Sequence, residues 1–370
     1  MKSNLSTSIN MGEQHMAKTL IERFLKSDER KYIFGTTSEA KALIALCQQQ
    51  GIEIAGVIDN FYQGEQFEGA PCCKLVDAIP QSLVLSAVTN SRPLEVAELL
   101  TKSGFTHIDY YSFFRLSGLP CPTIDFWAGA EQHWHNNGHK YREVRELFEE
   151  TKSKEIFDAV VSFRTSYDLE HMKGFAFDIS NMYIEPFVLP FKDEGVFFDL
   201  GAFDGSDTLR FLSLCDSGKS YMFEPIPEQV DKLNNIANNT DKISVVPVAV
   251  GNESKQVQFC LGGTSSKVST DGEPLENSIK VQQLSLDEFC EQHHVVPEYV
   301  KMDVEGAEQD VILGMETLLT QHKPKLAVSV YHRVEDIIDI PLMIKRANPE
   351  YKFYLRHYTQ GYSETVLFAV

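Results

Sequence analysis

The stretch Val196-Phe-Phe-Asp-Leu-Gly-Ala-Phe-Asp-Gly-Ser-Asp-Thr208 decides the fold. Large apolar residues give way there to two small residues and an Asp-Gly pair, and helix-forming residues follow through Leu214. This order predicts a buried parallel strand, a tight loop and the N-terminus of a helix. Gly201 and Gly205 would let the backbone approach a ligand closely, because neither carries a side chain.

The loop differs from the dinucleotide-binding fingerprint Gly-x-Gly-x-x-Gly, since its pattern is Asp-x-Gly-x-x-x-Gly. Asp207, in the first helical turn, would favour the helix N-terminus but repel a pyrophosphate there. We therefore expect a nucleoside ligand that carries positive charge, and the sulfonium S-adenosylmethionine is the obvious candidate. Glu224 ends the next predicted strand, at 220–225, where a carboxylate can accept the ribose hydroxyls.

Length and composition limit the classes of function. A chain of 370 residues is long for one core, so we expect two domains with a connector. The formal charge of −19 argues against general electrostatic binding of nucleic acid or anionic membranes. No apolar run reaches the roughly 20 residues of a spanning helix, and the polar start lacks a signal-peptide core, which predicts a cytoplasmic protein. The seven cysteines include no C-x-x-C pair, so neither a disulfide framework nor a structural zinc site is indicated.

The first part of the chain is expected to form an N-terminal helical segment at 1–30 and a small Rossmann-like α/β domain at 31–116. Its predicted strands lie at 32–35, 52–58, 83–88 and 108–113. The domain resembles the N-terminal domain of bacterial sugar acyltransferases, which holds a nucleotide-sugar. Asp59 ends the second strand, where a ribose-binding carboxylate belongs. A domain that serves only packing or dimerisation is the alternative.

Residues 117–190 are expected to form a helical connector. Its aromatic-rich part, 175–190, could close over the ligand as a lid or pack against the sheet, and the sequence leaves both open. The connector also holds His133, His135 and His139. Neighbouring histidines two residues apart do not share a helical face, so a surface loop is favoured over a metal site.

A second α/β unit, residues 191–370, continues with predicted strands at 243–250, 299–303 and 326–332, a loop at 262–266, and a helix running to Leu319. Its last two strands, 352–357 and 365–370, have no helix between them. They therefore predict an antiparallel hairpin at the end of an otherwise parallel sheet. Dinucleotide-binding domains continue as βαβ units instead, whereas class I methyltransferases end in such a hairpin.

An ordered set of motifs carries a family resemblance over about residues 145–370. The motifs are Phe198–Gly205, Phe223–Pro225, Leu284–Phe289, Lys301–Glu308, Pro324–His332 and Tyr354–His357. Together they resemble the FkbM family of S-adenosylmethionine-dependent methyltransferases, which commonly methylate hydroxyls of sugars or polyketide-derived products. The resemblance implies a class I methyltransferase domain whose cofactor-binding residues are Asp199, Gly201, Ala202, Phe203, Asp204, Gly205, Thr208, Glu224, Pro225, Val248 and Ala249.

The chemistry is expected to lie with Asp303, Glu305 and His332, at the ends of neighbouring strands. A sugar hydroxyl is a poor nucleophile until a base takes its proton. On ordinary pKa values, His332 is the better base at neutral pH unless Asp303 is desolvated. The three side chains could instead hold magnesium or manganese. We expect direct base catalysis and no metal, and we expect Glu308 to be a charge on a helix surface.

These features predict an S-adenosylmethionine-dependent O-methyltransferase that acts on a sugar, a nucleotide-sugar or a polysaccharide. Its partner would be a small-molecule or glycan acceptor rather than nucleic acid, and the protein could be a homodimer. Two other classes stay open: an NAD-dependent sugar-nucleotide oxidoreductase or epimerase, and a sensor or scaffold that binds the cofactor without turnover.

Overall fold

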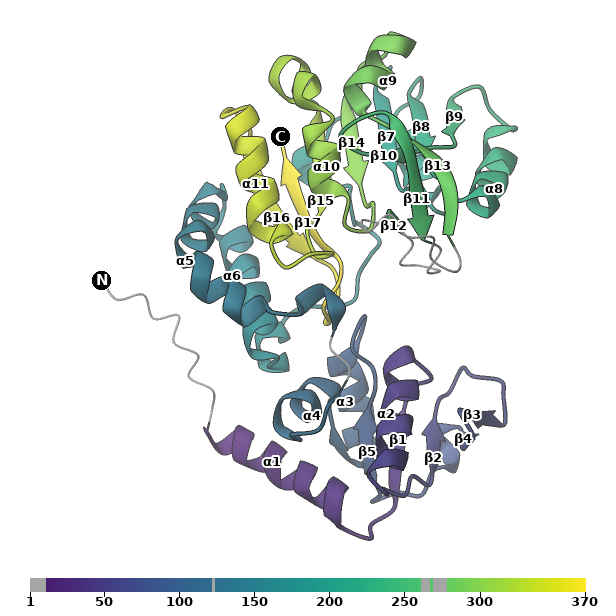
Figure 1. Cartoon of the computed structure of the whole chain (residues 1–370), viewed down its shortest axis with the longest axis vertical. Coiled ribbons are helices and arrows are strands. Elements are labelled where there is room, and N and C mark those ends of the chain that lie inside the picture. Colours follow the sequence, from purple (N-terminus) through teal and green to yellow (C-terminus); the bar gives the residue numbers. More distant parts are fainter. Residues whose placement is uncertain (1–10, 122–123, 261–266, 269–277) are drawn as a thin grey trace. The chain divides into compact units, whose positions relative to one another are not determined.

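The computed structural model describes residues 11–121, 124–260, 267–268 and 278–370 (Figure 1). The predicted loop at 262–266 therefore lies outside the described residues. The chain divides into two compact units that are not continuous in sequence. Unit 1 is Met1–Gln132, Asp158–Asp178 and Tyr358–Ser363, and unit 2 is His133–Phe157, Ile179–His357 and Glu364–Val370. Helices α5 (Ala130–Leu147) and α6 (Thr151–Ser166) contribute residues to both units.

Unit 1 is built around a sheet that, in the described residues, has six strands in the order β3-β4-β2-β1-β5-β6. All pairs are parallel except β3 with β4. The strands are β1 Lys31–Phe34, β2 Gly56–Ile58, β3 Gln66–Phe67, β4 Ala70–Cys73, β5 Leu83–Ser86 and β6 Thr106–Ile108. The helices are α1 Met11–Lys26, α2 Ser38–Gln49, α3 Pro93–Lys102 and α4 Tyr110–Leu116, with short 3-10 turns at Leu75–Asp77, Asp125–Trp127 and Leu169–Met172.

The alternation of side chains along β1 explains why helices cover both faces of this sheet. Ile33 is buried in a core that includes Leu43 of α2. Its neighbours Tyr32 and Phe34 are buried in a second core, together with Leu100 of α3. One strand thus supplies apolar side chains to two helical layers, as expected for a Rossmann-like α/β domain.

The predicted strand at 108–113 is wrong beyond its first residue. β6 ends at Ile108, and Asp109 then accepts a hydrogen bond on its side chain from the Ser112 amide at 2.9 Å. That bond caps the N-terminus of α4. The aromatic residues that favoured a strand are instead buried on the helix, because burial against the core outweighs strand propensity.

Unit 1 also contains a short segment from the end of the chain, Tyr358–Ser363. The Gln360 Oε1 atom accepts hydrogen bonds from the backbone amides of Leu94 and Glu95, both at 3.1 Å, and so caps helix α3. Gly361 lies against the β5–α3 turn, where an added Cβ would come within 2.5 Å of the Asn90 Cα. The segment is therefore an integral part of the unit 1 fold.

The main sheet of unit 2 has seven strands in the described residues, in the order β16-β17-β15-β14-β7-β8-β9. β17 runs antiparallel to both of its neighbours, and the other pairs are parallel. This confirms the predicted terminal hairpin and the fold class. The strands are β7 Val196–Leu200, β8 Lys219–Phe223, β9 Ile243–Val246, β14 Tyr299–Met302, β15 Lys325–Ser329, β16 Phe353–His357 and β17 Thr365–Ala369.

Five α-helices lie wholly within the described residues of unit 2, together with a 3-10 turn and a π-helical turn. The helices are α7 Ser206–Leu212, α8 Pro227–Ala237, α9 Leu286–His293, α10 Glu308–Leu313 and α11 Asp336–Ala347, and the turns are Pro186–Val188 and Leu318–His322. Helix α10 ends at Leu313, before the predicted Leu319, and the next residue, Gly314, packs directly on the backbone of Gly251. In the described part of the chain, no helix combines the length and apolar character needed to cross a membrane.

The strand predicted at 243–250 is divided between two sheets. β9 ends at Val246, and β10 (Ala249–Val250) pairs with β13 (Ser278–Leu284) in a small sheet of order β10-β13-β11-β12. The other strands of that sheet are β11 Lys255–Cys260 and β12 Lys267–Val268. Pro247 lies at the break, where it has no amide hydrogen to continue the ladder. The Val248 amide instead donates to the Val246 carbonyl at 2.9 Å, which turns the chain.

Candidate active site

The strand register of unit 2 brings the predicted site residues to one edge of its sheet. Lys301 of β14 pairs with Asp199 of β7, and Leu200 of β7 pairs with Phe223 of β8. The strands are parallel, so the segments that follow them, which contain Gly201–Gly205, Glu224, Asp303 and His332, emerge at the same carboxyl edge. This is the edge at which open parallel sheets bind ligands.

The loop after β7, Gly201–Gly205, is fitted to its neighbours by two glycines with positive φ, +75° at each. A Cβ added at Gly201 would lie 1.9 Å from the carbonyl oxygen of Asp303, so the loop touches the backbone that follows β14. Phe203 also has positive φ, at +46°, and its side chain is 53% exposed. Only glycine allows the approach at position 201 without moving Asp303.

Three other residues that were predicted to bind the cofactor differ in their surroundings. Ala202 is buried in a small core with Leu233 of α8. Asp204 is exposed, and its side chain accepts a hydrogen bond from the Ser206 amide at 3.0 Å. Thr208 is fully buried, and its hydroxyl donates to Asp199 Oδ2 at 2.8 Å. Thr208 therefore supports Asp199 from inside the protein rather than facing a ligand.

Lys301 is a site residue that the sequence reasoning missed. Its ammonium donates to the Gly201 carbonyl at 2.7 Å and lies 3.2 Å from Asp199 Oδ1 and 3.8 Å from Asp207 Oδ2. Burial alone would lower the pKa of Lys301, but the carboxylates of Asp199, Asp303 and Asp207 raise it above its ordinary range. The lysine thus remains a cation beneath the loop. A lysine inside the apolar run Tyr299–Met302 was the signal that could have revealed it.

Glu224, the predicted ribose acid, is buried directly after the end of β8. Its carboxylate accepts hydrogen bonds from the amides of Phe203 at 3.3 Å and Ile226 at 2.9 Å. Burial raises the pKa of Glu224, and these two backbone bonds oppose the rise. Each carboxylate oxygen can still accept a further hydrogen bond, since it carries two lone pairs.

The predicted adenine-side residues lie close to this glutamate through Ile226. Pro225 links Glu224 to Ile226, whose side chain packs against the core formed by Ala249, Phe259 and Val281. Ala249 is itself buried, and the preceding Val248 is only partly buried. The β9–β10 turn and the segment after β8 therefore come together.

A buried histidine organises the acidic residues at the other side of the loop. His332 Nδ1 lies 2.8 Å from Glu308 Oε1, and its Nε2 lies 3.4 Å from Asp303 Oδ1 and 3.5 Å from Glu305 Oε2. His332 is 6% exposed, and Glu308 is fully buried. The prediction that Glu308 is a surface charge is therefore wrong: it is the acid that holds the imidazole.

The charges in this cluster reverse the expected choice of base. Burial alone would lower the pKa of His332, but Glu308, Asp303 and Glu305 raise it to about 10, so the side chain is an imidazolium at neutral pH. Burial would raise the pKa of Asp303, but His332 and Lys301 hold it below its ordinary value. Burial raises the pKa of Glu305 to about 7, with Asp303 and Glu308 adding to the rise and His332 opposing it. Glu305, rather than His332, titrates near neutral pH.

The connector supplies a further residue that no motif revealed. Tyr183 is 1% exposed, and its hydroxyl donates to Asp303 Oδ2 at 2.9 Å and lies 3.2 Å from the Ser329 hydroxyl. Its φ of +68° is unusual for a residue other than glycine. At this position the aromatic-rich segment packs against the end of the sheet, one of the two arrangements that the sequence left open.

Metal binding has one geometric candidate among the described residues. Asp303, Glu308 and His332 place ligand-type atoms within 4.8 Å of one another. Glu308 already holds the protonated imidazole, so this geometry is also explained by an ion-paired histidine. The connector histidines form no such group in the described part of the chain, and His133 Nδ1 lies 2.9 Å from the Tyr141 hydroxyl.

The carboxylate of Asp59 in unit 1 accepts hydrogen bonds from neighbouring loop residues of the protein itself. One oxygen accepts from the amide and hydroxyl of Thr36, at 3.1 and 2.8 Å, and the other accepts from the amides of Phe61 and Tyr62, at 2.8 and 3.0 Å. These four bonds fix the turns after β1 and β2. They give Asp59 a structural role that requires no ribose.

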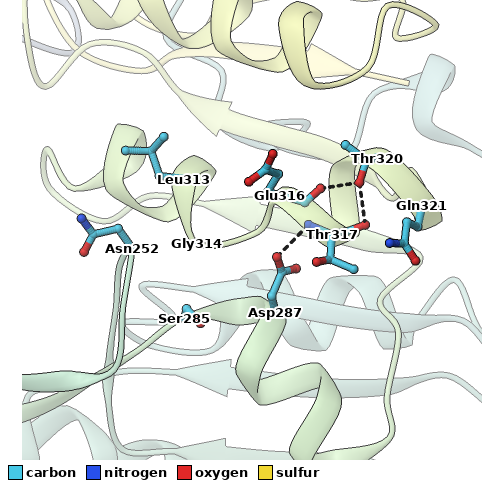
Figure 2. Close-up of a pocket in the computed structure, with 9 residues that line it drawn as sticks. All are labelled: Asn252, Ser285, Asp287, Leu313, Gly314, Glu316, Thr317, Thr320 and Gln321. Carbon is cyan, nitrogen blue, oxygen red and sulfur yellow. Dashed lines mark hydrogen bonds between the residues drawn. The ribbon is translucent and has the colours of Figure 1, made fainter.

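A polar depression of about 360 Å³ lies elsewhere in unit 2, and Figure 2 shows the residues that line it. Its lining residues are Asn252, Ser285, Asp287, Leu313, Gly314, Glu316, Thr317, Thr320 and Gln321. Asp287 accepts hydrogen bonds from the amides of Thr317 and Leu318, at 2.7 and 3.0 Å, and so caps the turn Leu318–His322. None of the predicted site residues lines this depression, and its acid is engaged in capping.

Sequence comparison agrees with the site geometry. Residues 199–352 match the methyltransferase FkbM domain, from Asp199 in β7 through the acid–histidine cluster and beyond it. The chain therefore carries an FkbM methyltransferase domain. This domain is similar to 2-O-methyltransferase NoeI of Sinorhizobium fredii, with 27% identity over 148 residues. It is also similar to hexuronic acid methyltransferase AglP of Haloferax volcanii, with 31% identity over 139 residues.

The curated relatives and a solved structure match different extents of the chain. Each sequence match covers 35% of this chain, and the matches span 61% of NoeI and 53% of AglP. A crystal structure of methyltransferase FkbM from Methylobacillus flagellatus matches with a TM-score of 0.73 and 21% identity. That match covers 95% of this chain and 92% of the solved chain, so the fold outside the FkbM domain also recurs there.

Proposed function

We propose that the chain is an S-adenosylmethionine-dependent O-methyltransferase that acts on a hydroxyl of a sugar, either free or within a nucleotide-sugar or glycan. One observation carries the proposal: a glycine-lined nucleoside loop and an acid–histidine cluster meet at Asp303. Its carbonyl is the atom that a Cβ on Gly201 would strike, and its carboxylate lies 3.4 Å from the His332 imidazole. The name of AglP, a hexuronic acid methyltransferase, supports a carbohydrate acceptor, and the name of NoeI, a 2-O-methyltransferase, supports transfer to oxygen.

The residues at the loop fit a cationic nucleoside. Gly201–Gly205 would hold the methionyl part, Glu224 the ribose hydroxyls, and Val248 and Ala249 the adenine side. Acidic side chains outnumber Lys301 around this loop, which suits a positively charged ligand and not a pyrophosphate. When bound, S-adenosylmethionine would supply an electrophilic methyl group on a positively charged sulfur.

The acid–histidine cluster would prepare the acceptor hydroxyl. Glu305 is partly ionised at neutral pH and its side chain is 28% exposed, so it can take the hydroxyl proton. The His332 imidazolium holds the carboxylates of Asp303 and Glu305 on one side of the site. The Asp303 side chain is 24% exposed, so its carboxylate can accept a hydrogen bond from the acceptor and orient it. Much of the rate enhancement would come from this alignment.

The donor assignment is tested by isothermal titration calorimetry with S-adenosylhomocysteine and, separately, with NAD. We expect binding of the first ligand only. Glu224→Ala should weaken S-adenosylhomocysteine binding roughly 10–100-fold, the range carried by hydrogen bonds to a charged group. Circular dichroism should show an intact fold. Strong NAD binding without a response to S-adenosylhomocysteine would instead favour an oxidoreductase or epimerase, and unchanged affinity in Glu224→Ala removes this residue from the ribose.

Acceptor chemistry is tested with S-adenosylmethionine labelled at its methyl group. The panel contains methyl glycosides of neutral hexoses, 6-deoxyhexoses and hexuronic acids, and mass spectrometry locates the label. We expect a methyl ether on at least one ring hydroxyl. A methyl ester on a hexuronic acid would contradict ether formation, and donor binding without any labelled product would favour a cofactor sensor.

A further inference from the structure

A buried lysine connects the donor loop to the strand beneath it. The Lys301 ammonium donates to the Gly201 carbonyl at 2.7 Å and lies 3.2 Å from the carboxylate of Asp199. The lysine is 3% exposed and Asp199 is fully buried. A buried ion pair of this kind is a weak source of stability but a strong constraint on geometry, because breaking it leaves an unpaired charge. The turn at Gly201 is thus fixed from inside the protein.

A buried tyrosine performs the corresponding task for the acceptor side. Tyr183 donates to Asp303 Oδ2 at 2.9 Å, which leaves Oδ1 directed to His332 at 3.4 Å. The tyrosine has φ of +68°, a conformation that costs on the order of 1 kcal/mol or more outside glycine. Its backbone carbonyl accepts a hydrogen bond from the Tyr299 hydroxyl, which helps to hold this conformation. The surrounding structure therefore aims the phenol at Asp303.

The two residues also contact each other. The Lys301 ammonium lies 5.3 Å from the centre of the Tyr183 ring, within the range of a cation–π interaction. A continuous set of contacts therefore runs from Gly201 through Lys301 and Tyr183 to Asp303. Both residues lie in unit 2, and neither belongs to the loop or to the acid–histidine cluster that they join.

We propose that Lys301 and Tyr183 are positioning residues for methyl transfer: Lys301 sets the donor loop, and Tyr183 sets the carboxylate that orients the acceptor. The inference rests on the proposed function, because it assigns the two ends of this contact chain to donor and acceptor. In-line transfer requires both reactants to be aligned, and a misplacement of about 1 Å can reduce a rate about 100-fold. Loss of Lys301 should therefore impair donor binding, whereas loss of the Tyr183 hydroxyl should impair transfer to the acceptor.

Tyr183→Phe tests the acceptor side. It keeps the ring beside Lys301 and removes only the hydroxyl. We expect the Kd for S-adenosylhomocysteine to stay within about 2-fold of wild type. With the glycoside that serves as acceptor, kcat should fall roughly 10–100-fold, as for a lost hydrogen bond to a charged group. Tyr351→Phe is the matched control: Tyr351 is also buried and donates one hydrogen bond, to the Pro324 carbonyl at 2.8 Å. It should lower thermal stability but leave kcat unchanged.

The donor side is tested with Lys301→Met and with the double variant Lys301→Met/Asp199→Asn, which removes both buried charges if the single variant fails to fold. We expect a Kd for S-adenosylhomocysteine at least about 10-fold above wild type in the folded variant. Wild-type kcat in Tyr183→Phe, or wild-type affinity in the folded double variant, overturns the inference. A wild-type protein that binds no S-adenosylhomocysteine overturns the proposed function itself, so the two failures are distinct.

Discussion

Glu305 should control the pH dependence of methyl transfer. Burial raises its pKa to about 7, so its ionised fraction is about 0.09 at pH 6 and about 0.91 at pH 8, and a rate that depends on this base rises about 10-fold between them. A glutamate at its ordinary pKa would give no change over that interval. Glu305→Gln should remove the rise and lower kcat roughly 100–10,000-fold, the usual contribution of a general base.

Two neighbouring charges provide opposite tests of the same assignment. The carboxylate of Glu364 raises the pKa of Glu305, so Glu364→Gln should move the rise to lower pH. The His332 imidazolium lowers that pKa, so His332→Gln should move the rise to higher pH, in addition to reducing kcat. If the two substitutions acted only on folding, they would not shift the pH profile in opposite directions.

The assay is the initial rate of label transfer from S-adenosylmethionine to a saturating methyl glycoside, at constant ionic strength from pH 5.5 to 9. Glu350→Gln, which neutralises an exposed acid outside the site, serves as the control and should retain the wild-type profile. The reasoning is refuted if Glu305→Gln keeps the rise near pH 7, or if the Glu364 and His332 variants shift it in the same direction.

Three further predictions follow from the geometry and charge of the site. Gly201→Ala should destabilise the protein by about 2–4 kcal/mol in denaturant titration, since a collision with the Asp303 carbonyl adds to strain at positive φ. Gly104→Ala, with similar φ and open space, should cost only about 1 kcal/mol, and equal losses would contradict the collision. The folded-state pKa of His332 is raised from 6.5 to about 10, so its protonated form should stabilise the fold fully below pH 6.5, with the contribution lost as pH rises through about 10. The melting temperatures of wild type and His332→Gln should therefore converge as the pH rises. A difference in melting temperature that stays constant with pH would contradict this prediction. Methyl transfer should survive dialysis against EDTA, whereas loss of activity that added magnesium or manganese restores would place a metal at Asp303 and His332.

The sequence predicted the first strand, loop and helix of the second α/β unit well because their signals are local. The strand, tight loop and helix at 196–208 follow one another along the chain, and Glu224 comes directly after the next strand. The terminal hairpin was equally clear, since no helical segment separates β16 from β17. Such patterns depend on neighbouring residues and need no knowledge of tertiary contacts.

The remaining features depend on contacts between distant residues. Tyr183 reaches Asp303 from the connector, and Lys301 pairs with Asp199 only through the strand register. Glu308 looked like a surface charge because it stands in an acidic helical turn, yet its burial beside His332 is set by the packing of α10. The choice of His332 as the better base rested on its ordinary pKa, whereas that pKa is raised by three carboxylates that the sequence does not place around it.

The capping of α3 by Gln360 has a consequence for how the chain folds during synthesis. Residues 358–363 are synthesised long after the described strands of the unit that they complete, because those strands all lie before residue 109. Domains usually fold in the order of their synthesis, N-terminal first. Here Gln360 follows Leu94 by 266 residues and Glu95 by 265, so the amides of both residues must wait for that much further synthesis before Gln360 can reach them. A C-terminal truncation that removed this short segment would therefore damage the N-terminal unit as well as the sheet that carries the methyltransferase site.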